Sequence, residues 1–126
     1  MATDRPDDPA ALLPEDSVLG LEDYLAMLAA LGNQTRFEIV YRLVHGAPLS
    51  PTELEECLAI DDSTLHYHLN ELLDVGLLEK RTRTERGEEG LYTYYQPTVF
   101  GEVVLKEGIE ELLRGEGAFE DMYSSS

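Results

Sequence analysis

The 126-residue sequence has one cysteine, no tryptophan and only two lysines. A single thiol, Cys57, cannot form a disulfide within the chain, and it is too few for a cysteine-rich zinc module. No apolar run approaches the roughly 20 residues that a membrane helix needs, and the acidic N-terminus is unlike a signal peptide. We therefore expect a cytoplasmic protein without a membrane partner.

Acidic residues dominate the composition. There are 26 Asp and Glu against nine Lys and Arg, which is a formal net charge of −17. A hydrophobic content of 43% is too high for a disordered chain of this charge. Acid-rich, lysine-poor surfaces keep a protein hydrated where concentrated salt screens its self-repulsion. We interpret the chain as a salt-adapted protein from a halophile; an ordinary acidic protein with acidic tails is the alternative.

The sequence predicts a single domain between two polar ends. Residues 1–16 contain three prolines and five acidic residues without lasting periodicity, which predicts a flexible acidic leader. Residues 115–126 are polar and contain glycine, which predicts a flexible tail. The patterned part, residues 17–114, contains no internal repeat.

Two amphipathic helices are predicted before residue 46. Ser17 is the expected N-cap of the first helix, which ends at Gly32. Its apolar residues are spaced i, i+4, i+7: Leu21, Leu25 and Leu28. Asn33 is the expected N-cap of the second helix, over residues 34–44. One face of that helix is lined by four apolar residues: Phe37, Val40, Tyr41 and Val44.

Two shorter helices follow. Ser50 and Glu53 have the spacing of a capping box, and proline stands at the first helical position, so a helix is predicted over residues 51–58. Asp61 is the expected N-cap of the next helix, over residues 62–74. The inner face of this helix is expected to consist of three leucines: Leu65, Leu69 and Leu72.

The periodicity changes after Gly76, which fits a helix C-cap. Residues 77–84 and 91–97 are predicted strands around a charged, glycine-rich turn, and together they form a hairpin. Thr98 can cap a last helix that extends to about Arg114. The predicted fold is therefore mainly α (α+β): a winged helix-turn-helix with a two-stranded wing and terminal dimerisation helices.

Three segments carry a family resemblance: LGNQTRFEIVYRL, LSPTELEECLAIDDSTLHYHLNELLDVGLLEKR and YTYYQPTVFGEV. In this order they resemble the ArsR-type winged-helix transcriptional regulators in their archaeal form. The tyrosine-rich wing and the terminal helix also resemble PadR-like regulators. The resemblance covers about residues 30–105, and it implies a DNA-binding regulator rather than an enzyme.

The polar face of the predicted helix over residues 62–74 offers candidate base-contacting residues: Ser63, Thr64, His66, Tyr67 and Asn70. Asn can bond an adenine edge bidentately, and Ser, His and Tyr supply further donors and acceptors, so we expect this helix in the major groove of DNA. A merely solvated polar face is the alternative. His68 lies beside the leucine stripe and is expected to be a packed structural histidine.

Basic residues cluster in the predicted wing, residues 78–96. Four of the nine fall within seven positions: Lys80, Arg81, Arg83 and Arg86. We expect them on the phosphate backbone or in the minor groove, with Arg36 as a lesser phosphate contact. A hairpin neutralised by its own glutamates is the alternative. The wing tyrosines are expected mostly in the core: Tyr92, Tyr94 and Tyr95.

No metal, cofactor or catalytic residue is predicted. Metal sensors of the resembled family often carry paired cysteines in the helix before the turn, whereas here Cys57 stands alone, and one thiolate cannot hold a soft metal. His66 and His68 are two residues apart on a helix and point in different directions. We expect Cys57 to be a small buried apolar residue rather than a thiol switch. The chain has no phosphate loop, nucleophile elbow or HExxH motif.

The last predicted helix carries more apolar residues than one core-facing surface needs, which indicates a homodimer interface. Its candidate residues are Leu25, Leu28, Val104, Ile109 and Leu112. The expected function is sequence-specific transcriptional regulation on double-stranded DNA with a palindromic operator. The alternative is a winged-helix protein-interaction module of the transcription machinery.

Overall fold

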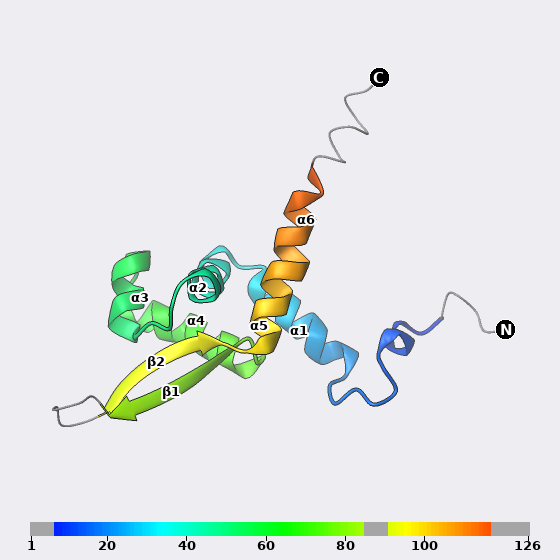
Figure 1. Cartoon of the computed structure of the whole chain (residues 1–126), viewed down its shortest axis with the longest axis horizontal. Coiled ribbons are helices and arrows are strands. Elements are labelled where there is room, and N and C mark those ends of the chain that lie inside the picture. The colour runs from blue at the N-terminus through cyan, green and yellow to red at the C-terminus, as the bar shows by residue number, and fades with distance from the viewer. Residues whose placement is uncertain (1–6, 85–90, 117–126) are drawn as a thin grey trace, which may run out of the picture.

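The computed structural model describes residues 7–84 and 91–116. Helices form most of it, and the two strands form one antiparallel hairpin, so the predicted mainly α winged helix-turn-helix fold is confirmed (Figure 1). The elements in chain order are a 3-10 helix η1 (Pro9–Leu12), α1 (Leu21–Leu31), α2 (Gln34–His45), α3 (Pro51–Leu58), α4 (Asp62–Asp74), β1 (Leu78–Thr84), β2 (Leu91–Pro97), α5 (Val99–Val103), a π-helical turn η2 (Val104–Ile109) and α6 (Glu110–Arg114).

The start of α1 differs from the prediction. Ser17 is not its N-cap, because the Ser17 hydroxyl donates to the Leu19 carbonyl oxygen at 2.8 Å. The helix begins after Gly20, whose N–H donates to Oδ2 of Asp23 at 2.8 Å. A carboxylate three residues into the helix thus satisfies the backbone at the true start, and it also suits the positive end of the helix dipole.

The other predicted N-caps are confirmed. The Asn33 side chain accepts from the backbone of the first turn of α2. Ser50 and Glu53 form the reciprocal capping box of α3. Asp61 accepts the Thr64 N–H at 2.7 Å, and this bond lowers the pKa of the Asp61 carboxyl. Short polar side chains therefore set where these three helices begin.

The core lies between α1, α2, α4 and the base of the hairpin. Its fully buried side chains are Ile39, Val40, Leu54, Leu65, Leu69, Leu72, Leu77 and Leu105. The predicted leucine face of α4 is among them, so that prediction is confirmed. Together these residues form one apolar core.

The buried face of α2 is the predicted one only in part: Val40 is buried, and Phe37 and Val44 pack half-buried against the core. Ile39, Val40 and Leu43 are buried, whereas Tyr41 is 46% exposed and stacks with Phe37 at the edge of the helix. Half of the twelve residues of α2 are apolar, so more than one stripe satisfies helical periodicity. The contacts with α1, α4 and β2 decide which stripe is buried.

The turn after α4 is joined to the start of α5. Gly76 has a φ of 84°, the left-handed conformation that glycine adopts without a Cβ penalty. The Thr98 hydroxyl donates to the Gly76 carbonyl oxygen at 2.6 Å, and the Thr98 N–H donates to Leu77 O at 3.0 Å. A Cβ on Gly101 would lie 2.3 Å from the same Leu77 oxygen. This glycine therefore allows α5 to cross the backbone in direct contact.

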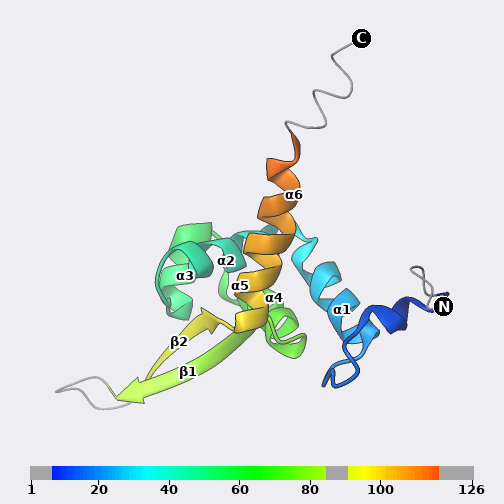
Figure 2. The same cartoon turned by 45° about the vertical axis from the view of Figure 1, so that its right-hand side comes forward.

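The predicted last helix is present, but it contains a π turn. The Glu110 N–H donates to Leu105 O, five residues earlier, where an α-helix bonds four residues back. From α5 through α6 the segment rises out of the body of the molecule (Figure 2). Leu105 anchors it in the core, while its far turn, Glu110–Arg114, has no buried residue.

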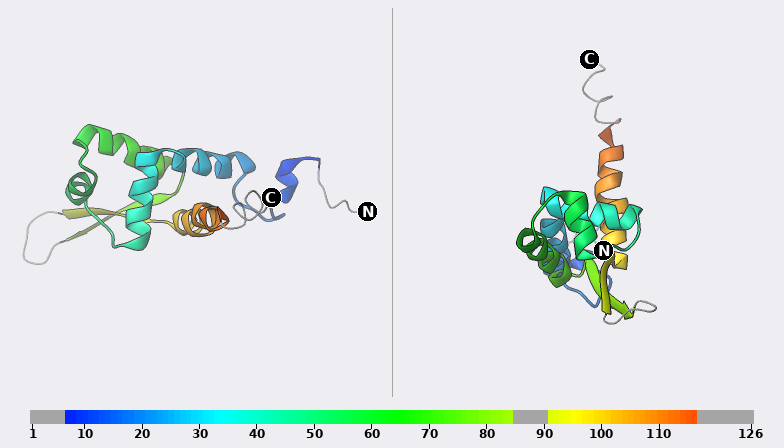
Figure 3. Two further views of the ribbon diagram at one scale, coloured as in Figure 1. Left: turned by 90° about the horizontal axis from the view of Figure 1, so that it is seen from above. Right: turned by 90° about the vertical axis from the view of Figure 1, so that its left-hand side faces the viewer.

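The elements separate into two ends (Figure 3). The hairpin and α3 lie at one end, with the N-terminal part of α4, while α1 and the N-terminal segment lie towards the other. Leu49 forms an isolated antiparallel bridge with Tyr95, which ties the connection before α3 to the base of β2. This bridge has no sequence signal of its own, and it was not predicted.

Part of the predicted leader is described. The 3-10 helix Pro9–Leu12 lies within it, and Asp8 accepts the Ala10 N–H as its N-cap. Residues 1–6 of the leader, the wing turn at 85–90 and most of the predicted tail lie outside the described residues. In the part of the chain that is described, no helix is long and apolar enough to cross a membrane.

Candidate nucleic-acid interface

The predicted base-contacting residues lie on one outward face of α4. Ser63, Thr64, Tyr67 and Asn70 are exposed, and Tyr67 retains 58% of its accessible surface. His66 is half-buried, and its Nδ1 lies 3.2 Å from an oxygen of the Asp62 carboxylate one turn earlier. The opposite face of α4 is buried, so the helix presents a polar surface on a rigid support.

A tight turn orients α4 relative to α3. Leu54 of α3 is fully buried, and the helix ends at Ala59 in a left-handed conformation with a φ of 55°. The Ala59 N–H donates to Glu55 O at 2.8 Å. Only Ile60 and Asp61 then separate this cap from the start of α4, which is the connection that a helix-turn-helix requires.

His68 and Arg36 connect three helices beneath this face. The buried His68 ring places Nδ1 3.1 Å from Nη1 of Arg36, whose Nε donates to Ala30 O at 2.7 Å. Burial and the neighbouring guanidinium lower the pKa of His68, so its neutral Nδ1 accepts from Arg36. His68 is placed as the structural residue we expected. Arg36 is thus bonded within the fold, and its expected phosphate contact stays a prediction.

The wing presents its basic residues on β1. Lys80, Arg81 and Arg83 are exposed, while Arg86 lies outside the described residues. Nη2 of Arg81 lies 3.1 Å from Oε1 of Glu79. The Gln96 amide donates to the other oxygen of Glu79 at 2.8 Å, and this bond is the main cause of the lowered pKa of Glu79. Part of the wing charge is therefore balanced locally.

The expectation that most of the wing tyrosines pack in the core is wrong. Only Tyr95 is buried. Tyr92 and Tyr94 lie on the other face of β2, where the carbon centre of the Arg83 guanidinium is 4.8 Å and 5.3 Å from their ring centroids. Alternation along a strand sends residues 92 and 94 to one side and residue 95 to the other. Two of the three tyrosines thus form a platform for a wing arginine.

Cys57 is exposed, so the expectation that it is buried is also wrong. Leu54 and Leu58 occupy the inward positions of α3, and the helical rotation leaves Cys57 outside. Among residues 7–84 and 91–116, no group of three His, Cys, Asp or Glu side chains could hold a metal ion.

Apolar side chains are also exposed on α1 and on α6. Leu25 and Leu112 are 54% and 72% exposed, and Leu28 is also exposed. The other two predicted interface residues, Val104 and Ile109, are half-buried and pack against the core of their own chain. Leu113 of α6 is exposed as well.

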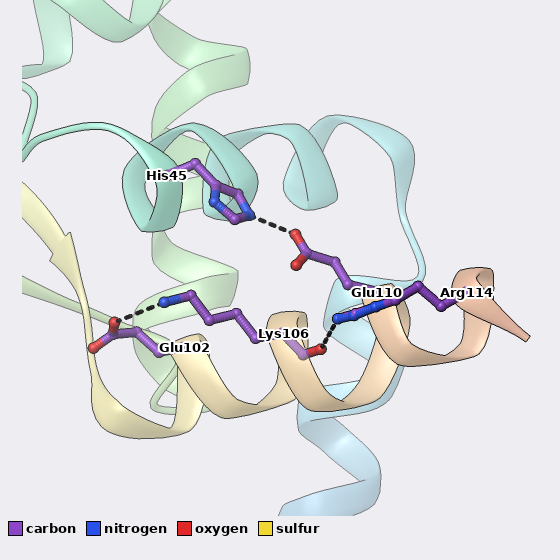
Figure 4. A network of polar contacts seen from close by, with 5 residues as sticks. All are labelled: His45, Glu102, Lys106, Glu110 and Arg114. Atoms are coloured by element: carbon purple, nitrogen blue, oxygen red, sulfur yellow. Dashed lines mark hydrogen bonds and ion pairs between the residues drawn. The ribbon is translucent and has the colours of Figure 1, made fainter.

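The base of α6 is held by a polar contact that the sequence did not indicate (Figure 4). Nε2 of His45, at the end of α2, lies 2.5 Å from Oε2 of Glu110. On the same helical segment, Lys106 pairs with Glu102 at 3.9 Å. The His45 and Glu110 positions are 65 residues apart in the chain, so no local pattern could predict their contact.

The helix-turn-helix, its exposed polar second helix and the adjoining hairpin define a winged helix-turn-helix protein. A family model described as a helix-turn-helix domain matches residues 31–81. The putative arsenical resistance operon repressor ArsR of Halobacterium salinarum is 32% identical over 87 residues, 68% of this chain and 62% of the relative. The arsenical resistance operon repressor of Bacillus subtilis is 35% identical over 75 residues, 60% of this chain and 66% of the relative.

Solved structures show the same fold. HlyU from Vibrio cholerae is 26% identical with a TM-score of 0.56, covering 72% of this chain and 91% of that chain. The homodimeric winged helix-turn-helix DNA-binding domain of Mb0332 from Mycobacterium bovis is 20% identical with a TM-score of 0.61, covering 91% and 93%. The chain is similar to ArsR-type repressors in sequence and shares the winged helix-turn-helix fold of these structures. It spans just under two-thirds of the length of the two curated relatives.

Proposed function

We propose that this protein is a sequence-specific DNA-binding transcriptional regulator that acts as a homodimer. The observation that carries the proposal is the outward polar face of α4 beside an exposed basic wing, on a helix whose other face is buried. A helix that needs only solvent on its outer side does not require this set of hydrogen-bonding side chains. The repressor names of the relatives support the same assignment.

In this proposal α4 enters the major groove, and its exposed side chains contact base edges: Ser63, Thr64, His66, Tyr67 and Asn70. Asn70 can bond an adenine through both its amide oxygen and its amide nitrogen. The wing follows the backbone or the minor groove with Lys80, Arg81, Arg83 and Arg86, because guanidinium groups bond phosphate bidentately. In this arrangement α4 supplies the sequence specificity, and the wing supplies affinity that does not depend on the DNA sequence.

The exposed leucines of α1 and α6 supply the dimer contact. Burying Leu25 and Leu112 against a second copy removes apolar surface from water, and a two-fold axis uses each side chain twice. Two α4 helices related by that axis would enter successive major grooves about 34 Å apart, which requires a palindromic operator.

The acidic charge fits a salt-rich cytoplasm, as in the haloarchaeal source of one relative. A dimer with −17 per chain is repelled by DNA at low salt. Near 1 M salt the Debye length is about 3 Å, so distant repulsion is screened while close arginine–phosphate contacts persist. Specific affinity should therefore persist or rise between about 0.5 and 2 M KCl. A steep loss of affinity across this range would reject the salt-adapted part of the proposal.

The test of DNA binding is fluorescence anisotropy with genomic fragments in molar KCl. Asn70→Ala should reduce preference for the specific site by about 1–3 kcal/mol while leaving non-specific affinity almost unchanged. Arg83→Ala should weaken both equally, because phosphate contacts carry no sequence information. If the unaltered protein binds no fragment, the proposal fails and a winged-helix module for protein interaction takes its place.

A further inference from the structure

One side chain of the wing is bonded to α3. The Tyr92 hydroxyl donates to Oε1 of Glu53 at 3.0 Å. The same oxygen accepts the Ser50 N–H at 2.8 Å, as part of the capping box that begins α3. These two bonds, the Ser50 N–H first, lower the pKa of the Glu53 carboxyl, so it stays ionised as an acceptor. The second wing strand is thus bonded directly to the first helix of the helix-turn-helix.

Tyr92 also determines the surroundings of Arg83. The two residues are opposite one another in the β1–β2 register. The Tyr92 and Tyr94 rings stack with centroids 6.0 Å apart and an interplanar angle of 28°, and the Arg83 guanidinium lies over both. A rigid aromatic platform reduces the rotamer freedom of a long side chain. The place of Arg83 therefore follows the place of Tyr92.

The base of the hairpin is also bonded to the connection before α3. The Leu49–Tyr95 bridge holds the base of β2, with backbone bonds of 2.8 and 3.2 Å. A two-stranded hairpin is marginally stable by itself, so a wing tied only at its base can pivot. Tyr92 lies three residues farther towards the tip, and its bond to Glu53 is a second point of attachment. With both attachments the wing has a fixed direction relative to α3, whereas with the base attachment alone it could rotate.

The chemistry of this bond also suits concentrated salt. An exposed ion pair weakens as salt screens it, whereas a hydrogen bond from a neutral phenol to a carboxylate depends on contact geometry at short range. The Tyr92–Glu53 bond is of the second kind, and the Arg83 guanidinium adds a weaker Coulombic attraction to the same carboxylate.

We propose that the Tyr92–Glu53 hydrogen bond is a latch that holds the wing against α3 and positions Arg83 relative to α4 before DNA is bound. Tyr92 and Glu53 are positioning residues in this account, and Arg83 is the residue that they position. The inference rests on the proposed function only for the consequence in DNA binding; the latch itself is a property of the free protein.

The first experiment measures the latch without DNA. The native Cys57, exposed on α3, and a Thr82→Cys substitution on the exposed strand β1 accept two spin labels. Labelled chains are mixed with excess unlabelled protein, so that electron–electron distances within one chain dominate. We expect a narrow distance distribution in this parent and a clearly wider one in Tyr92→Phe, which keeps the ring and removes the donor. Tyr94→Phe is the matched control and should remain narrow.

Variants of Glu53 separate the latch from the cap. Glu53→Gln retains an oxygen that can accept both bonds, and it should keep the distribution narrow. Glu53→Ala should widen it. A Tyr92→Phe distribution identical to that of the parent would overturn the latch, whatever the variants do to DNA binding.

The second experiment measures DNA affinity of the unlabelled proteins in molar KCl. Tyr92→Phe should weaken specific binding about threefold to tenfold, the effect of one modest hydrogen bond, and Tyr94→Phe should not. If the distances respond but the parent binds no DNA, the proposed function fails and the latch stands. If the parent binds and Tyr92→Phe binds equally well despite wider distances, the positioning role is overturned.

Discussion

The two ends of this molecule expose opposite kinds of surface on the same type of scaffold. On α4 the outward side chains include hydroxyl, amide, imidazole and carboxylate groups, and Leu65, Leu69 and Leu72 are buried. On α1 and α6 the outward side chains include leucines that remain half or more exposed. Polar edges fit a partner that offers donors and acceptors, whereas exposed leucines gain free energy only against another apolar surface. The contrast indicates two partners of different chemistry.

The two surfaces are not independent, because one junction connects them. Thr98 bonds both residues of the turn that follows α4, and Gly101 packs its backbone on Leu77. The helix that carries the apolar end is thereby held against the turn where α4 ends and β1 begins. Substitutions at the junction should affect both ends, and substitutions at either end should affect only one.

The largest effect is expected at the junction. Gly101→Ala places a Cβ against a backbone oxygen that cannot rotate away, so we expect a loss of about 3 kcal/mol in the free energy of unfolding. Gly108→Ala is the control, because its nearest neighbour is a side-chain atom at 4.0 Å. Denaturant unfolding in molar KCl measures both. If Gly101→Ala were as stable as the unaltered protein, the close contact of α5 with the Leu77 backbone would not be needed for stability.

A substitution in the exposed leucines of α1 should weaken the dimer without affecting DNA recognition by α4. Leu25→Glu should raise the dimer dissociation constant about 100-fold, since a two-fold interface loses each leucine twice at roughly 1.5 kcal/mol or more per side chain. Leu12→Glu is the control, because Leu12 is 75% exposed on η1, outside the proposed interface. Sedimentation equilibrium reports the constants. A dimer that tolerates Leu25→Glu would place the interface elsewhere.

A smaller effect is expected beneath α4, from the His68–Arg36 contact. The folded state lowers the pKa of His68 from its usual 6.5, so the unfolded chain binds that proton more strongly. The free energy of unfolding should therefore fall as the pH drops below about 6.5 and through the folded pKa. His68→Gln should flatten this decline. Unfolding curves at fixed KCl between pH 8 and pH 5 test the difference.

The last prediction is that added metal ions or arsenite have no effect on DNA affinity. The two curated relatives are named as arsenical resistance repressors, yet this chain has a single cysteine, and that residue is exposed on α3. One thiolate cannot hold a soft metal. Arsenite, zinc or nickel should therefore leave DNA affinity unchanged, both in the unaltered protein and in Cys57→Ser. A shift that disappears in Cys57→Ser would assign the thiol a sensing role, for instance between two subunits.

Local chemistry predicted most of the secondary structure. Asn33, Ser50 and Asp61 each cap a helix where the sequence places them, because an N-cap bond joins residues two or three positions apart. The leucine spacing of α4 is also enough to predict its buried face, since only one stripe of that helix is apolar. The outward polar face follows from the same spacing, so the candidate base-contacting residues could be selected without a structure.

Long-range contacts account for what the sequence alone did not predict. In α2, where half of the residues are apolar, the neighbouring helices select the buried stripe. Cys57 is outside because Leu54 and Leu58 occupy the inward positions, and Arg36 is bonded to Ala30 and His68. The contacts of Tyr92 with Glu53 and of His45 with Glu110 join residues 39 and 65 positions apart. Sequence periodicity determines which elements form and which faces are polar; the tertiary packing decides which side chains meet, because those contacts depend on how the helices and the wing cross.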